Sequence, residues 1–235
     1  MLGFGKISKG RNWLKFEDSN VGYSTGNAVN DNFTPMGAYF FNIGEDVASI
    51  NTINFENAPD MGALQLWVVD KGLGTVQKAY WFLEYDGIPA GWFDEDGENE
   101  VNVDIAKGQG VLLSTGDAGV TSGLSGEVSA TALADFPVND NFTVFANPYP
   151  ADLPIANISF KNAPDMGALQ MWVVDKGLGT VKKAYWFLEY DGIPAGWFDE
   201  DGENEETYDI TPGSAVLLSC GDAGVTMDVA SPIKL

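Results

Sequence analysis

The chain has no histidine and a single cysteine, Cys220, among its 235 residues. The lack of histidine excludes Ser-His and Cys-His catalytic pairs and most zinc sites, because each of them needs an imidazole. One cysteine cannot form a disulfide within the chain, and a threonine, Thr115, stands at the matching position of the internal repeat described below. We therefore expect a protein that is not an enzyme.

Basic residues are also scarce. Lys and Arg total 12 against 34 Asp and Glu, which gives a formal net charge of −22. A nucleic-acid backbone and an anionic lipid surface are both bound by clustered Lys and Arg. We therefore expect neither among the partners. Strong acidity favours a protein of a salty or calcium-rich medium outside the cell, and it also serves solubility alone.

Long hydrophobic runs are missing as well. No stretch of about 18 apolar residues is present. The first ten residues, MLGFGKISKG, lack the apolar centre of a secretory signal peptide. We predict no membrane insertion, and we expect the chain to be the mature form of an extracellular or cell-surface protein. Sequons at Asn32, Asn141 and Asn157 would permit N-glycosylation.

The sequence does contain a long internal repeat. Residues 55–100 recur as residues 160–205 with three differences in 46 positions. The offset of 105 continues to the end of each copy, whereas Asn30–Phe33 matches Asn139–Phe142 at an offset of 109, so copy two is four residues shorter in between. Such a repeat predicts two similar structural units. We assign residues 1–29 to a basic arm with the first strand or strands, 30–128 to module one and 129–235 to module two.

The local pattern is that of β-structure throughout. Residues 63–70 and 76–85 are rich in β-branched and aromatic side chains, and the glycines of the 71–74 segment predict a hairpin between them. A second hairpin is predicted around the acidic turn at 94–97, with residues 100–105 as its returning strand. Short strands divided by Gly, Pro and Asn turns predict an all-β fold of two tandem antiparallel sandwich-like or barrel-like domains.

Two turn motifs of copy two resemble a known type of module. Asn147-Pro148-Tyr149-Pro150 and the later Pro212-Gly213-Ser214-Ala215 resemble turns of β-sandwich modules in large secreted and surface proteins of some Gram-negative bacteria. There an N-P-Y/F-P turn precedes a strand, and a P-G-x-G/A turn closes the module. Copy one departs from this, because its stretch near Asn42-Ile43-Gly44 lacks the prolines. The resemblance implies an extracellular structural or adhesive role and no known chemistry.

The acidic turn is a candidate Ca²⁺ site in each copy, because Ca²⁺ prefers hard oxygen ligands on a glycine-containing loop. The candidate ligands alternate along the turn: Asp94, Asp96, Glu98 and Glu100, repeated as Asp199, Asp201, Glu203 and Glu205. Trp92 stands where an EF-hand loop would begin with an acidic ligand, so the motif is not of that type. The alternative interpretation is a hairpin turn with solvated charges.

Aromatic residues recur at matching positions and have two interpretations. On alternating strands half of them face the core, and we expect this of Trp67 and Trp81. The others would form a platform for a glycan or an interface with another protein. Trp92 and Tyr85, with Trp197 and Tyr190 in copy two, are the candidates for this surface role.

The N-terminal arm is basic, whereas the rest of the chain is acidic. The first 16 residues carry +4 and no acid, which leaves −22 − 4 = −26 for the remainder. Its candidate contact residues are Leu2, Phe4, Lys6, Ile7, Lys9, Arg11 and Lys15. We predict a self-assembling extracellular structural protein, a subunit of a filament or surface layer whose arm docks on a neighbouring subunit. The alternative is a monomeric, adhesin-like tandem that binds a carbohydrate or a protein partner.

Overall fold

The computed structural model describes residues 3–7, 11–16, 19–29, 33–59, 62–69, 74–84, 86–116, 119–139, 141–164, 167–174 and 179–233. Within these ranges the protein is all-β, with several antiparallel sheets, and the predicted fold class is confirmed. The helices of the described ranges are two single 3₁₀ turns, Ile50–Thr52 (η1) and Ile155–Asn157 (η3), and neither is long enough to cross a membrane.

Module one is built from two larger sheets and one small one. The first sheet has the order β1 (Gly3–Ile7), β2 (Arg11–Phe16), β3 (Ser19–Val29), β12 (Val120–Glu127), β6 (Ile53–Glu56). The second has the order β4 (Phe33–Gly37), β11 (Gly110–Ser114), β7 (Gln65–Val69), β8 (Thr75–Phe82), β9 (Gly91–Phe93). The strands β5 (Val47–Ser49) and β10 (Asp104–Ala106) pair separately.

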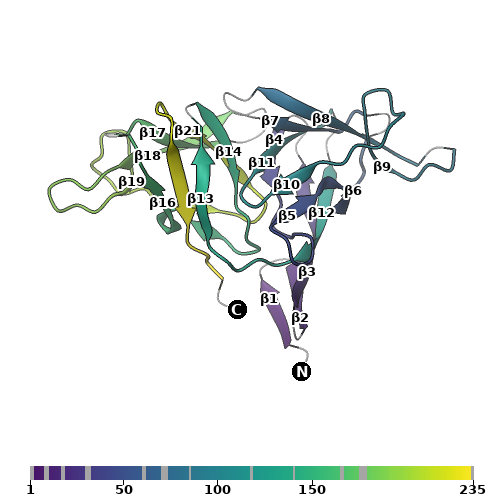
Figure 1. Cartoon of the computed structure of the whole chain (residues 1–235), viewed down its shortest axis with the longest axis horizontal. Helices are drawn as coiled ribbons and strands as arrows, with labels where there is room; N and C mark the ends of the chain where they lie inside the picture. The colour runs from purple at the N-terminus through teal and green to yellow at the C-terminus, as the bar shows by residue number, and fades with distance from the viewer. Residues whose placement is uncertain are drawn as a thin grey trace.

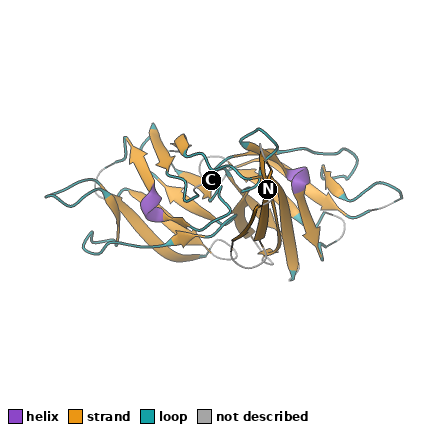
Figure 2. Cartoon of the chain, turned by 90° about the horizontal axis from the view of Figure 1, so that it is seen from below, coloured by secondary structure: helices purple, strands orange, loops and turns teal. Residues whose placement is uncertain are grey.

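Module two repeats this plan without the first two strands. Its first sheet has the order β13 (Leu133–Val138), β22 (Val225–Val229), β16 (Ile158–Lys161). Its second sheet has the order β14 (Phe142–Ala146), β21 (Ala215–Ser219), β17 (Leu169–Val174), β18 (Thr180–Phe187), β19 (Gly196–Phe198). The pair β15 (Leu153–Pro154) and β20 (Asp209–Ile210) matches β5 and β10. The two modules lie side by side along the long axis, each with one 3₁₀ turn (Figure 2).

Each module encloses a core between its two larger sheets. Alternation along the strands directs every second residue inward: in β7, Leu66 and Val68 are buried in the core of module one, and Trp67 and Val69 face the other way. A buried Leu or Val side chain contributes about 1.5–3 kcal/mol. The predicted hairpin of β7 and β8 is confirmed by their antiparallel register.

The second predicted hairpin is wrong beyond its turn. Glu100 forms one isolated bridge with Phe93, but β10 pairs with β5 and not with β9. The physical reason is burial: Val103 and Ile105 lie in the core of module one, and this draws the chain away from the edge of the sheet.

The structure also explains the N-P-Y-P turn. Asn147 is buried, its Nδ2 donates to the carbonyls of Ala151 and Ile210 at 2.8 and 2.7 Å, and its Oδ1 accepts from the N–H of Tyr149 at 2.9 Å. The registers of β4 and β14 show that Ala38–Phe41, rather than Asn42–Gly44, is its counterpart in module one. A buried side chain with three such bonds fixes the chain direction after β14.

The two modules meet through the outer faces of their β4 and β14 sheets, along a contact that we call the seam. Its buried members are Leu112, Val144, Ala146, Ala215 and Leu217. Trp67, expected in a module core, is half-buried at the edge of the seam instead, where its ring packs edge-on against Phe33 with centroids 4.9 Å apart. Trp172 and Phe142 repeat this contact at 5.0 Å.

The seam has an internal two-fold character. The N–H of Gly37 donates to the carbonyl of Gly213 at 3.0 Å, and the N–H of Ala146 donates to the carbonyl of Gly108 at 3.0 Å. Ala146 matches Gly37, and Gly213 matches Gly108, by the offsets of the repeat. The same surface of each module therefore contacts the other, as in an isologous dimer.

The linker between the modules, residues 128–132 between β12 and β13, is hydrogen-bonded to a buried lysine. The Nζ of Lys107 donates to Ser129 Oγ at 2.8 Å and to the carbonyl and hydroxyl oxygens of Thr131 at 2.7 Å each. Burial lowers the pKa of Lys107, and Asp46, 3.6 Å away, partly opposes this. From module two, the hydroxyl of Tyr149 donates to the Thr131 carbonyl at 3.0 Å. Both modules thus hold the linker, which fixes their relative orientation together with the seam.

Candidate functional site

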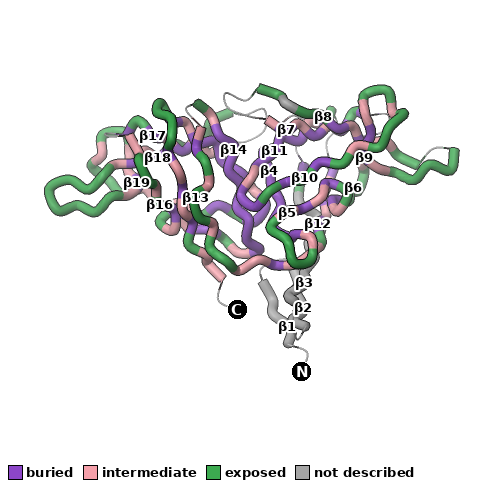
Figure 3. The backbone as a smooth tube through the Cα atoms, in the orientation of Figure 1, coloured by how far each residue is buried: buried purple, intermediate pink, exposed green. Residues whose placement is uncertain are grey.

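Several exposed apolar side chains of the duplicated block lie on loops at opposite ends of the molecule. We call residues 83–100 and 188–205 the distal loop sites. They follow β8 and β18 and flank β9 and β19, at the two ends of the long axis (Figure 1). Ile88 is 50% exposed in one site, and Tyr190 and Ile193 are 75% and 51% exposed in the other. The buried residues concentrate instead in the modules and at the seam (Figure 3).

In module two the distal loop site forms an apolar groove of about 560 Å³. Its lining residues are Phe187, Leu188, Tyr190, Ile193 and Phe198, with Glu189, Asp201 and Gly202. Exposed apolar surface with a polar rim is typical of interaction sites. The groove can therefore accept an apolar group, and its carboxylates favour an occupant that is also cationic.

A tight turn presents the two most exposed side chains of this groove. The backbones of Tyr190 and Ile193 are joined by reciprocal hydrogen bonds of 3.1 and 2.9 Å. Between them Asp191 and Gly192 have φ of 50° and 80°, the left-handed pair that a type I′ turn requires. Asp86 and Gly87 have φ of 50° and 85° in module one. The sequence Asp-Gly thus gives a left-handed pair of residues at both ends of the molecule.

The acidic turn is a second rigid element of each site. In module two, Asp199 Oδ1 accepts from the N–H of Glu203 at 2.9 Å, and its Oδ2 accepts from Asn204 Nδ2 at 2.6 Å. The Asn204 bond, more than the backbone bonds, lowers the pKa of the Asp199 carboxyl. In module one, Asp94 makes the matching bonds to Glu98 and Asn99 at 2.9 and 2.6 Å.

The hydrogen bonds of Asp94 and Asp199 bear on the predicted Ca²⁺ site, because they occupy carboxylate oxygens that would bind the ion. Asp94 and Asp199 cap their own turns, and the other predicted ligands are exposed to solvent: Asp96, Glu98, Glu100, Asp201, Glu203 and Glu205. Among the described residues, no group of three acidic side chains is close enough to hold a metal ion. The alternative interpretation, a hairpin turn with solvated charges, therefore describes the geometry.

The predicted surface role of Trp92 and Trp197 is wrong, because these side chains are only 1% and 2% exposed. The indole N–H of Trp92 donates to the carbonyl of Ile50 at 3.2 Å, and its ring packs edge-on against Trp81 with centroids 5.4 Å apart. The inward face of β9 pairs Trp92 directly with Trp81 of β8. Both tryptophans support the loops from inside the core.

The remaining predicted interface residues have different outcomes. Tyr190 is exposed and lines the groove, whereas Tyr85 lies outside the described residues. Four further apolar residues, which were not among the predicted interface residues, are exposed as well: Leu83, Ile88, Leu188 and Ile193. The Tyr-Asp-Gly-Ile sequence could have predicted their exposure. Asp-Gly favours a type I′ turn, and the residues on either side of such a turn are exposed when no further strand covers them.

The N-terminal arm is part of a sheet in its own chain. β1 and β2 pair with each other over Gly3–Ile7 and Arg11–Lys15, and β2 pairs with β3. The predicted contact residues Phe4, Lys6, Ile7, Arg11 and Lys15 lie on these two strands, and Leu2 and Lys9 lie outside the described residues. The hairpin projects from the body of module one, and β1 is the outermost strand of its sheet (Figure 1).

Comparison of the chain with models of known families, with curated proteins and with solved structures found no match. The resemblance of its turns to bacterial surface modules stays a prediction. The function proposed for this chain therefore depends on its own sequence and geometry.

Proposed function

We propose that the chain is a self-assembling structural protein outside the cell, a subunit of a filament or surface layer, and not an enzyme. The observation that carries the proposal is the presence of two matching distal loop sites at opposite ends of one fixed body. A subunit with contact sites at both ends joins a neighbour at each, and contacts that do not close into a ring extend without limit.

The surface that fits a distal loop site is the N-terminal arm of another subunit. Each site carries seven acidic and no basic residues, whereas residues 1–16 carry four basic and no acidic ones, with apolar residues interspersed. Opposite charges steer the encounter, and apolar contacts in the groove supply the affinity. Each subunit has one arm and two distal loop sites. An arm would occupy one site, and the other would be available for a lateral contact of the kind that a layer needs.

The alternative is a monomeric tandem that binds a carbohydrate or a protein partner in the manner of an adhesin. The specific observation in its favour is the exposed ring of Tyr190 over an apolar groove, an arrangement suited to stacking on a sugar. Two matching sites on one chain would raise the avidity for a multivalent partner. This alternative predicts a discrete particle of 25.2 kDa.

Negative-stain electron microscopy of the chain tests the proposal, beside a variant that lacks residues 1–16. We expect filaments or sheets from the full chain and isolated two-lobed particles from the deletion variant. Assembly that survives the deletion would refute the role of the arm. Isolated particles from the full chain at all salt concentrations would refute assembly and favour the tandem binding module. A chelator should not change the result, because the acidic side chains that the structure describes form no group close enough to hold a metal ion.

A further inference from the structure

A pocket of about 330 Å³ opens beside the edge strand β16 of module two. Trp186 and Trp197 contribute to its wall from the inner face of β18 and β19, and the 154–159 and 205–209 segments supply most of the rest. The next residues along these two strands, Phe187 and Phe198, line the distal groove instead. Because successive side chains of a strand point to opposite faces, the pocket and the groove lie on opposite faces of β18 and β19.

Residues at this pocket differ between the two otherwise similar modules. One of the three differences within the 46-residue repeat places Lys182 where module one has Gln77, and the next three positions change Val101-Asn102-Val103 into Glu206-Thr207-Tyr208. The Nζ of Lys182 lies 2.7 Å from Glu206 Oε2 and donates to the carbonyl of Thr207 at 3.1 Å. It also lies 5.9 Å from the centre of the Tyr208 ring. The four replaced residues therefore form one cluster at the edge of the pocket.

The matching place in module one is bridged by side chains. There Asn102 Oδ1 accepts from the hydroxyl of Ser49 at 2.5 Å and from Asn51 Nδ2 at 3.2 Å. Module two has Pro154 and Ala156 at the positions of Ser49 and Asn51. Neither has a side-chain donor or acceptor, so the bridge cannot form and the pocket stays open.

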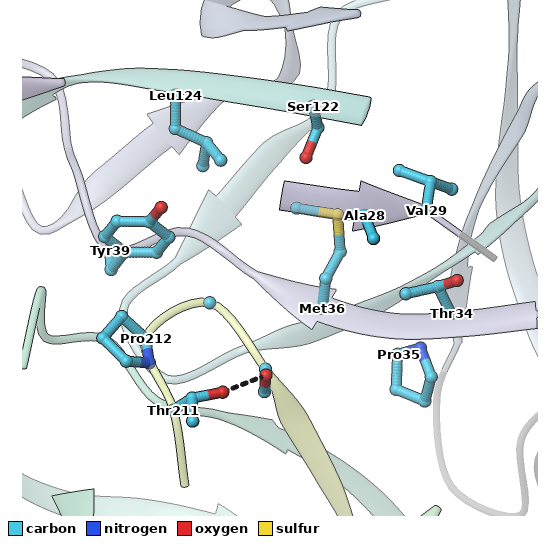
Figure 4. Close-up of a pocket in the computed structure, with 12 residues that line it drawn as sticks. Ala28, Val29, Thr34, Pro35, Met36, Tyr39, Ser122, Leu124, Thr211 and Pro212 are labelled. Atoms are coloured by element: carbon cyan, nitrogen blue, oxygen red, sulfur yellow. Dashed lines mark hydrogen bonds between the residues drawn. The ribbon is translucent and has the colours of Figure 1, made fainter. Parts of the chain in front are cut away.

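A second pocket, of about 300 Å³ where module two meets the edge of module one, does not differ in this way (Figure 4). A Cβ on Gly213 would lie 2.5 Å from the ring of Tyr39, and a Cβ on its counterpart Gly108 would lie 3.3 Å from the ring of Phe136. A ring of the other module thus packs against each of the two matching glycines. This place is part of the seam, and it is filled alike on both sides.

The polar groups of the pocket beside β16 indicate what it would bind. The hydroxyls of Ser159, Thr207 and Tyr208 line it and make no hydrogen bond with another described residue. Each hydroxyl both donates and accepts, and the carboxylates of Glu205 and Asp209, which also line the pocket, accept. The replacement of Gln77 by Lys182 and of 101–103 by 206–208 adds one positive charge, one negative charge and two hydroxyls. The change from module one therefore adds hydrogen-bonding groups and no net charge.

We infer that this pocket binds one neutral hexose residue of a glycan, an activity separate from assembly. A sugar ring carries several hydroxyls, which pair with hydroxyls and carboxylates, and an apolar C–H face, which suits aromatic side chains such as Tyr208. An anionic ligand would be repelled by Glu205 and Asp209, and an apolar one would displace water from the polar groups without replacing its hydrogen bonds. A cavity of roughly 150 Å³ holds benzene, so the volume accommodates a single substituted ring.

The test is calorimetric titration of the full chain with the methyl glycosides of glucose, galactose and mannose. We expect saturable binding of at least one of them, with a dissociation constant below about 10 mM. The amino sugar and the uronic acid that correspond to it should bind at least about tenfold more weakly, because each carries a charge.

Two sets of variants locate the site in module two. The triple variant Pro154→Ser, Ala156→Asn, Thr207→Asn, which installs the bridging residues of module one, should abolish binding. Asp209→Ala should weaken binding at least about tenfold. Its matched control is Asp104→Ala, the same substitution at the corresponding position of module one, which should leave binding unchanged.

Four results would overturn the inference: no saturable binding of any of the three glycosides, equal affinity for the charged sugars, unchanged affinity in a folded triple variant, or equal losses in Asp209→Ala and Asp104→Ala. If the triple variant does not fold, the two aspartate variants decide alone. Assembly of the chain is measured separately, so none of these results depends on it.

Discussion

At the residue scale, the indole of Trp92 has the environment of a core side chain. Its ring lies within 5.6 Å of that of Phe55 and within 5.4 Å of that of Trp81, centroid to centroid, and Trp197 repeats both contacts. Edge-to-face pairs of this kind contribute about 0.5–1.5 kcal/mol beyond the area that they bury. The trio thus supports each distal loop site from inside the module.

This environment predicts a contrast between two aromatic substitutions. Trp197→Ala should lower the free energy of unfolding by about 3–5 kcal/mol, because it leaves a large cavity. Tyr190→Ala should change it by less than about 0.5 kcal/mol, because the ring is exposed. Urea unfolding of both variants measures the difference. An equal decrease in the free energy of unfolding in both variants would contradict the prediction, because it would mean that the two side chains have similar environments.

The turn aspartates predict a dependence on pH. Folding lowers the pKa values of Asp94 and Asp199 below the ordinary 3.8, chiefly through the bonds from Asn99 and Asn204. Their stabilising contribution is therefore present above 3.8 and is lost as the pH falls through the lowered values. The double variant Asp94→Asn, Asp199→Asn should lose less thermal stability on acidification than the unmodified chain. Parallel pH profiles of the two proteins would contradict this.

Sequence patterns predict residue roles unevenly, and Trp92 shows why. β9 has three residues, too few for an alternation that would reveal which side chain faces inward. Trp92 also stands close to Pro89 and Gly91, residue types that are common in surface turns, and its burial follows only from the pairing of Trp92 with Trp81. The Asp-Gly pair after Tyr190 would have been a better guide, because the turn type that it favours depends on local backbone geometry.

At the scale of elements, the strands were largely predictable and their partners were not. β-branched and aromatic runs marked β7 and β8, and a short glycine-containing connection made their pairing predictable. β10 pairs instead with β5, where Ile105 lies opposite Ala48, 57 positions earlier in the chain, because the buried residues of β10 complete the core. The seam was not predictable either, since Trp67 and Val69 differ from core residues only in what covers them.

The seam predicts a strong effect of one methyl group. A Cβ on Gly37 would overlap the Cβ of Ala146 and approach the carbonyl of Gln109, so Gly37→Ala should cost about 1–3 kcal/mol. Gly116→Ala is the matched control, because nothing lies within 4 Å of its added Cβ. Urea unfolding of both variants tests the contact. A neutral Gly37→Ala would mean that the modules do not meet as described.

At the scale of the whole molecule, the charge distribution predicts how salt acts on assembly. The body of the chain, without its first 16 residues, carries −26, so attraction to the arm competes with repulsion between bodies. Salt screens exposed charges beyond about 8 Å at physiological ionic strength and weakens both effects. If the arm contact dominates, assembly should decrease as salt rises. Light scattering over a salt series measures this, and assembly that increases with salt would indicate that repulsion dominates.

The two distal loop sites have the same sequence, and the internal two-fold seam places them at opposite ends of one body. This arrangement would give the subunit one attachment point at each end. A control for substitutions in these sites is Val181→Ala, because the Val181 side chain is 61% exposed and does not line the groove.

The most direct measurement is sedimentation velocity of the chain beside the variant Ile88→Ala, Tyr190→Ala, Ile193→Ala and the Val181→Ala control. We expect large species from the unmodified chain and from the control, and a particle of about 25.2 kDa from the triple variant, with the same far-ultraviolet circular dichroism in all three. Large species of unchanged size from the triple variant would show that the distal loop sites are not the points of attachment between subunits.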